Sequence, residues 1–120
     1  MLTLKKNYEF QSVLKKGTWY GGNLLNIYVL KNNKDNNRVG VAVGKKVTKS
    51  SVKRNRIRRL IKEAYRLEEV KIKSGINIVI VWKTSCAFEL ANFYAIKNDL
   101  KQCFKKAGIY NKNVEEDANV

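Results

Sequence analysis

Residues 76–83, "INIVIVWK", form an almost unbroken run of β-branched and aromatic residues. Such a run is typical of a central β-strand that is covered on one or both faces. It follows a segment with helical periodicity, 51–69, which in turn follows the alternating stretch "RVGVAVG" at 38–44. A strand, a helix and a second strand in this order predict a crossover connection within one sheet.

Two more strands are predicted before this unit. The alternating segment 24–31 is separated from 38–44 by the polar sequence "NNKDNN" at 32–37, which has the composition of a turn. This pattern predicts that 24–31 and 38–44 pair as an antiparallel hairpin. The segment "GTWYGG" at 17–22 is a candidate short strand in front of them.

Two further helices are predicted near the ends of the chain. The helix at 7–16 has Asn7 as its expected N-cap and Gly17 as its expected left-handed stop. The helix at 88–107 is expected to end at Gly108. Its apolar face consists of Leu90, Phe93, Ile96, Leu100, Cys103, Phe104 and Ala107.

The predicted fold is α+β, with the element order αβββαβα. The economical arrangement is one mixed four-stranded sheet with helices packed mainly on one face. Residues 1–110 are expected to form a single domain, and 111–120 a polar, frayed tail. The second face of the sheet is rich in polar and small residues, which predicts the floor of a groove, formed by Asn26, Tyr28, Leu30, Gly40 and Ala42.

The composition points to a polyanionic partner. The chain carries 25 basic and 10 acidic residues, a net charge of +15, whose self-repulsion such a partner would relieve. That partner is either nucleic acid or an anionic membrane surface. No apolar run reaches the ~18 residues of a spanning helix, and no secretory signal is visible at the N-terminus, so a cytoplasmic protein is expected. Cys86 and Cys103 fall in apolar patterns and are predicted to be core thiols.

The charge is concentrated in residues 49–66, "KSSVKRNRIRRLIKEAYR", where eight of eighteen positions are Lys or Arg. At 100° per residue one stripe of this helix is apolar and is expected to face the sheet. That stripe consists of Ile57, Leu60, Ile61, Ala64 and Tyr65. Cations surround it, and no acidic residue occurs between Arg38 and Lys62. Cations in the first turns of a helix are each unfavourable by about 0.3–1 kcal/mol, so their repetition there indicates phosphate binding.

These residues carry a family resemblance. "RVGVAVGKKV" at 38–47, followed by "KRNRIRRLIKEAYR" at 53–66, resembles the signature of the bacterial ribonuclease P protein component, and the resemblance extends from about residue 5 to 110. It implies the ribosomal protein S5 domain 2-like fold, with a left-handed crossover. It also implies two partners, a catalytic ribonuclease P RNA and precursor tRNA, from which the holoenzyme removes the 5′ leader.

The resemblance also implies which residues bind RNA. The residues that it implies to contact the RNA subunit are Lys53, Arg54, Asn55, Arg56, Arg58, Arg59, Lys62 and Arg66. A cleft between the first helix and the open face of the sheet would hold the single-stranded leader, through Phe10, Leu14, Tyr28, Lys45 and Lys46. Aromatic platforms beside cations are the usual means of binding single strands, which fits Phe10 and Tyr28.

No catalytic residue and no metal ligand set is predicted on the protein. The chain has no histidine, and its carboxylates neither cluster nor show metal-ligand spacing. By resemblance, the chemistry of this endoribonuclease and its Mg²⁺ belong to the RNA subunit, and no obligate protein partner or membrane is expected. Two alternatives remain: a ribosomal or rRNA-associated binding protein, and a peripheral membrane protein that uses a basic amphipathic helix.

Overall fold

The structure is a computed structural model and describes residues 1–111. Its strands are β1 (Leu2–Thr3), β2 (Thr18–Gly21), β3 (Leu25–Lys31), β4 (Arg38–Ala42) and β5 (Ile76–Trp82). Its helices are α1 (Asn7–Lys16), α2 (Ser51–Glu69), a short 3₁₀ turn η1 (Phe88–Leu90), and α3 (Phe93–Ala107). The predicted α+β order is confirmed, with β1 as an additional strand that the sequence pattern did not reveal because it is only two residues long.

The five strands form one mixed sheet in the order β1-β4-β5-β3-β2. β5 lies in the centre, parallel to β4 and antiparallel to β3. The predicted hairpin of β3 with β4 is therefore wrong, because β5 is inserted between them, and β3 instead forms its hairpin with β2. β5 is the most apolar strand, so the central position, where both faces can be covered, suits it best.

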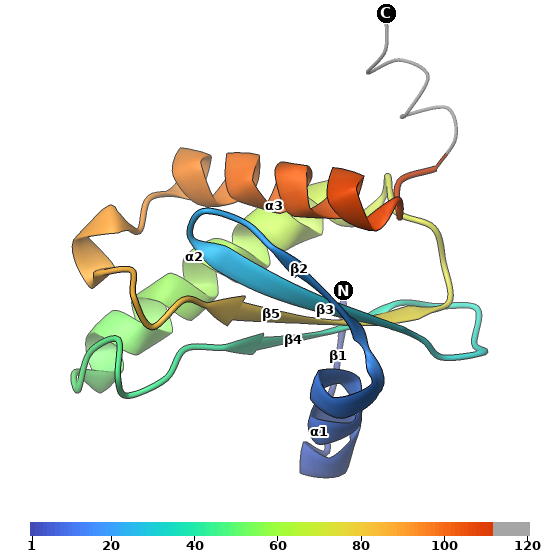
Figure 1. Cartoon of the computed structure of the whole chain (residues 1–120), viewed down its shortest axis with the longest axis horizontal. Helices are drawn as coiled ribbons and strands as arrows, with labels where there is room; N and C mark the ends of the chain where they lie inside the picture. Colours follow the sequence, from blue (N-terminus) through green and yellow to red (C-terminus); the bar gives the residue numbers. More distant parts are fainter. Residues whose placement is uncertain (112–120) are drawn as a thin grey trace, which may run out of the picture.

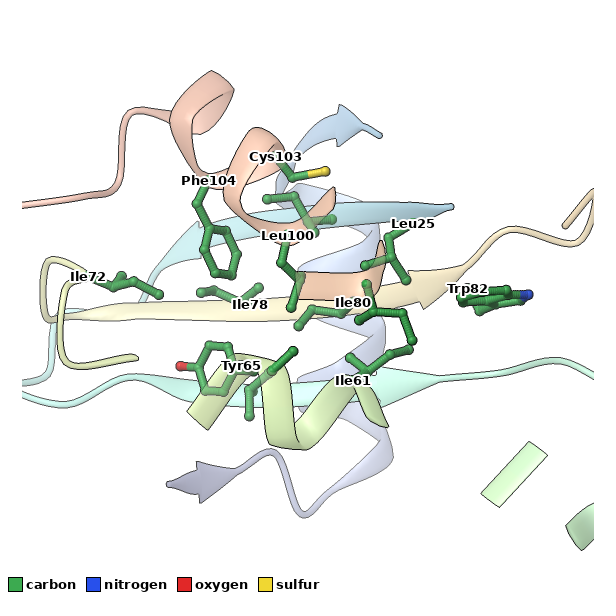
Figure 2. Close-up of a cluster of buried hydrophobic side chains, with 14 of the residues drawn as sticks. Leu25, Ile61, Tyr65, Ile72, Ile78, Ile80, Trp82, Leu100, Cys103 and Phe104 are labelled. Carbon is green, nitrogen blue, oxygen red and sulfur yellow. The ribbon is translucent and has the colours of Figure 1, made fainter. Parts of the chain in front are cut away.

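The helices divide unequally between the two faces of this sheet, as Figure 1 shows, with α2 and α3 on one face and α1 on the other. The main core lies under α2 and α3. In Figure 2, Ile61 and Tyr65 from α2 and Leu100 and Phe104 from α3 lie over one face of the central strand β5. Cys86 and Cys103 are buried free thiols, as predicted. Within residues 1–111, none of the helices combines the length and the apolar character needed to cross a membrane.

The caps at both ends of helix α1 differ from those predicted. Asn7 is its first residue, and the N-cap is Lys6, whose backbone N–H donates to Glu9 Oε1 at 3.3 Å. Gly17 has a φ of −72°, which is not left-handed. Glycine is needed there for space, because a Cβ would lie 2.5 Å from the carbonyl oxygen of Val13.

Helix α3 begins later than the predicted residue 88. The Asn92 side chain caps it by accepting the Ala95 N–H at 2.9 Å, and the preceding residues form η1. Leu90 consequently lies outside the helix and is 52% exposed, rather than in the core. The predicted stop at Gly108 is confirmed, with a φ of +65°.

A buried carboxylate joins α3 to the β2–β3 hairpin. Asp99 accepts three backbone N–H groups, from Asn23 at 2.7 Å and from Leu24 and Leu25 at 2.9 Å each. The chain passes so close that a Cβ on Gly22 would lie 2.5 Å from Asp99 Oδ2. This contact fixes the position of the hairpin and, with it, the aromatic residues that β2 and β3 carry.

Cys103 is expected to resist alkylation in the folded protein. Burial, reinforced by the nearby Asp99 carboxylate, raises the pKa of its thiol from 9.0 to about 11. Because the folded pKa is the higher one, this group stabilises the fold below about pH 9 and loses that contribution as pH rises through 11. At pH 8, iodoacetamide should label Cys103 roughly a hundredfold more slowly in buffer than in denaturing urea, as peptide mass spectrometry would measure. Equal rates would contradict its burial.

Candidate nucleic-acid interface

The basic helix α2 is anchored to the sheet by its apolar stripe, as predicted. Ile57 and Ile61 are fully buried, and Leu60 is half-buried against the same core. Ala64 and Tyr65 complete the buried stripe. The rest of the helix circumference is therefore free to carry charge without loss of packing.

Most of the predicted RNA-binding residues face solvent. The exposed ones are Lys53, Asn55, Arg56, Arg59, Lys62 and Arg66, while Arg54 and Arg58 are half-buried. The helix begins at Ser51, as predicted, and Ser50 Oγ caps it by accepting the Lys53 N–H at 3.2 Å. Its first turn has no acidic residue, so the positive end of the helix dipole and the side-chain cations have the same sign.

The two half-buried arginines brace the loop that precedes α2. Arg54 Nη1 donates to the carbonyl oxygens of Thr48 and Lys49, both at 3.0 Å. Arg58 donates to Asn55 Oδ1 at 2.6 Å and, more weakly, to the Val43 carbonyl oxygen at 3.4 Å. These guanidinium groups thus shape the interface as well as contributing charge to it.

Carboxylates neutralise little of this surface. Among the described residues, Arg66 is the one member of the basic set that forms an ion pair, with Glu63 Oε1 at 3.3 Å. Both side chains of this ion pair are exposed, so the pair contributes little to the stability of the fold. Arg56, Arg59 and Lys62 have no such partner within residues 1–111, which leaves their charge available to a polyanion.

On the opposite face of the sheet, α1 covers one side of the predicted groove. Val13 is fully buried and seals the helix to the sheet, while Phe10 and Leu14 are half-buried. A Cβ on Gly40 would lie 2.7 Å from Phe10 Cε2. Gly40 therefore lies on the predicted face of the sheet, but Phe10 covers it, so Gly40 is not part of the open floor.

The open part of this face carries two neighbouring aromatic residues. The register aligns Trp19, Tyr28, Val79 and Gly40 across four adjacent strands. Tyr28 is half-buried, and Trp19 beside it is 57% exposed, next to Gly21. Trp19 was absent from the predicted site, although the alternation of "TWYG" would have placed it beside Tyr28 had the β2–β3 hairpin been recognised.

Lys45 and Lys46 lie apart from these aromatic residues. They are exposed on the loop between β4 and α2, beyond Ala42, the last residue of β4. That loop is the one braced by Arg54 and Arg58, so the two lysines extend the cationic surface of α2 toward the end of the sheet at which β4 finishes. Nowhere in residues 1–111 do three or more His, Cys, Asp or Glu side chains gather closely enough to hold a metal ion.

Comparison with known proteins agrees with this geometry. The sequence profile of the Ribonuclease P family matches residues 1–108. The ribonuclease P protein component of Clostridium kluyveri is 45% identical over 109 residues, spanning 89% of this chain and 95% of that protein. That of Clostridioides difficile is also 45% identical, over 107 residues that span 88% of this chain and 91% of that protein.

Solved structures show the same fold. The RNase P protein of Staphylococcus aureus superposes with a TM-score of 0.80 at 28% identity, covering 92% of this chain and 99% of that one. The RNase P protein of Thermotoga maritima has a TM-score of 0.78 at 23% identity, over 88% and 97% of the two chains, and supports the fold alone. These relatives favour the ribonuclease P expectation over a ribosomal protein. The chain, with its anchored basic helix, belongs to the ribonuclease P protein family and is an RNA-binding protein of tRNA processing.

Proposed function

We propose that α2 docks this protein onto the ribonuclease P RNA, and that the cleft beneath α1 binds the 5′ leader of precursor tRNA. The observation that carries the first part is a helix whose apolar stripe packs against the core while Arg56, Arg59 and Lys62 remain exposed and without carboxylate partners in the described chain. Guanidinium groups on a rigid helix suit bidentate phosphate contacts, and their fixed position limits the entropy lost on binding.

The aromatic side chains of the α1 face support the second part. A single-stranded leader presents unpaired bases, which stack on aromatic rings whatever their sequence. Tyr28 and Trp19 offer two adjacent rings, and Phe10 forms the wall of the cleft on the α1 side. Lys45 and Lys46 stand beyond the end of this floor, where the leader would approach the RNA bound by α2.

The side chains of this protein suit RNA binding, so in this proposal the protein binds and the RNA subunit catalyses. The protein would neutralise repulsion between two RNAs and orient the leader, while the scission itself, and the Mg²⁺ that supports it, belong to the RNA subunit. The described residues offer no group of carboxylates suited to two-metal phosphoryl chemistry, so no step is assigned to an ion held by the protein. A component that works on newly made tRNA would act in the cytoplasm.

Tyr28→Ala tests the cleft. In complex with a ribonuclease P RNA, this variant is expected to weaken binding of leader-bearing precursor tRNA about tenfold, because one base loses a stacking partner worth about 1–3 kcal/mol. Binding of mature tRNA, which has no leader, should change less than about twofold. Equilibrium binding with both labelled tRNAs measures the ratio.

The exposed Tyr94 on α3 provides the matched control. Tyr94→Ala removes the same ring from the opposite side of the sheet and should leave both affinities unchanged. If Tyr28→Ala lowers the affinities for precursor and mature tRNA equally, Tyr28 does not bind the leader.

A further inference from the structure

A lysine-lined groove lies at one end of the sheet and belongs to neither of the two surfaces described above. Its volume is about 680 Å³, and four lysines line it, Lys16, Lys31, Lys34 and Lys73. None of the lining residues carries a carboxylate; the adjacent turn contributes one, on Asp35. The groove also has an apolar wall, which includes Tyr20, Val29, Ile76 and Ile109. Cations above an apolar wall are the surface that a phosphodiester chain with exposed bases requires.

The lysine-bearing loops are fastened to one another, so the groove is preformed. Asn32 in the β3–β4 turn donates its backbone N–H to the Gly75 carbonyl oxygen at 3.0 Å, and its Oδ1 accepts the Lys34 N–H at 2.8 Å. From the other side, Lys73 Nζ donates to the carbonyl oxygen of Gly108 at 3.2 Å. These bonds fix the backbone of the β3–β4 turn against residues 73–75 and the ammonium group of Lys73 against the end of α3.

The groove lies at the end of the sheet, and most of its wall, including Val29, Ile76 and Ile109, belongs to the face covered by α2 and α3. It reaches the α1 face, which carries Tyr28, at Leu30. Leu30 lines the groove and, by alternation along β3, lies on the same face as Tyr28, only two residues or roughly 7 Å away. Lys16 on its rim is the last residue of α1, the helix that walls the cleft. At the other end of the sheet, β4 ends at Ala42 opposite Val81, and the chain continues there into the loop before α2.

We infer that the distal nucleotides of the leader, those farthest from the cleavage site, pass Leu30, turn around the end of the sheet and bind in this lysine groove. This inference rests on the proposed function, because it extends the same leader path. The basic helix begins at one end of the sheet and the groove lies at the other, so a leader that starts beside the RNA subunit and crosses Tyr28 is directed toward the groove. Its phosphates would meet Lys16, Lys31 and Lys34.

Leader length is the variable that tests this inference. The full chain, assembled with a ribonuclease P RNA, would bind precursor tRNAs with leaders of about five and about fifteen nucleotides, chosen to end within the cleft or beyond it. The double variant Lys31→Ala with Lys34→Ala should weaken binding of the long leader about five- to tenfold and of the short one less than twofold. It should also make the log–log salt slope shallower by about 1 to 1.5 for the long leader alone.

The matched control, Lys5→Ala with Lys97→Ala, removes the same charge outside the groove and should affect both leaders alike. A loss in Lys31→Ala/Lys34→Ala that is equal for both leader lengths, or absent, overturns the groove while the Tyr28→Ala effect stands. If Tyr28→Ala leaves the binding of both leaders unchanged, the cleft is not the leader site, and the groove inference fails with it. Circular dichroism melts of each variant confirm that the fold is intact.

Discussion

Arg56→Glu combined with Arg59→Glu is expected to weaken binding of ribonuclease P RNA by at least about a hundredfold at roughly 0.15 M salt. The two substitutions remove two phosphate contacts and place two carboxylates against the RNA backbone, a change of four charges. If α2 and its loop touch about five to eight phosphates, the log–log salt slope of the unmodified protein should be roughly −4 to −7. The variant should have a clearly shallower slope.

The fold should survive this change, which makes the result interpretable. Arg56 and Arg59 are exposed, and neither forms an ion pair within residues 1–111. Surface substitutions of this kind usually alter the free energy of unfolding by less than about 0.5 kcal/mol each. Thermal melts and filter binding on the same preparations would separate lost affinity from lost structure.

The control for net charge is Lys5→Glu with Lys97→Glu, two lysines outside α2, the cleft and the lysine groove. It changes the total charge equally and should weaken binding only a few-fold, through the long-range field. If both double variants lose affinity to the same extent, the helix is not the docking surface and binding is a property of overall charge.

The basic helix could be predicted almost completely because its determinants are local. The helical spacing of Ile57, Leu60 and Ile61 identifies the buried stripe, and Ser50 marks the start, within one short segment of the chain. What the sequence did not show is that Arg54 and Arg58 also hold the loop before the helix, since their acceptors are backbone carbonyl groups with no side-chain signal.

The order of the strands could not be predicted in the same way because it depends on non-local pairing. The turn at 32–37 is locally a good hairpin turn, yet β5, from more than thirty residues later, occupies the position between β3 and β4. That insertion decides the composition of the cleft. It places Val79 rather than Gly40 beside Tyr28, and Gly40 lies one strand farther away, beneath Phe10.

Asp99→Ala is expected to lower the free energy of unfolding by about 3 kcal/mol, because three backbone N–H groups lose their acceptor at once. A small domain has a total stability of roughly 5–15 kcal/mol, so this is a large fraction of it. Asp99 itself is 6% exposed, which means that water can replace the lost carboxylate only in part. Urea unfolding followed by tryptophan fluorescence measures the change.

Asp99→Asn and Asn98→Ala separate the role of the carboxylate from that of the helix. Asn keeps one oxygen acceptor, so Asp99→Asn should lower the free energy of unfolding less than Asp99→Ala does. Asn98 is exposed on the same helix, so Asn98→Ala should change the free energy of unfolding by less than about 0.5 kcal/mol. Since the three N–H groups belong to the turn between β2 and β3 and to the first residue of β3, loosening them should also release Trp19 and Tyr28 from a fixed register. Asp99→Ala should therefore reduce affinity for leader-bearing tRNA even at temperatures where the variant stays folded. A loss of stability without any loss of leader affinity would show that the position of the β2–β3 hairpin does not control leader binding.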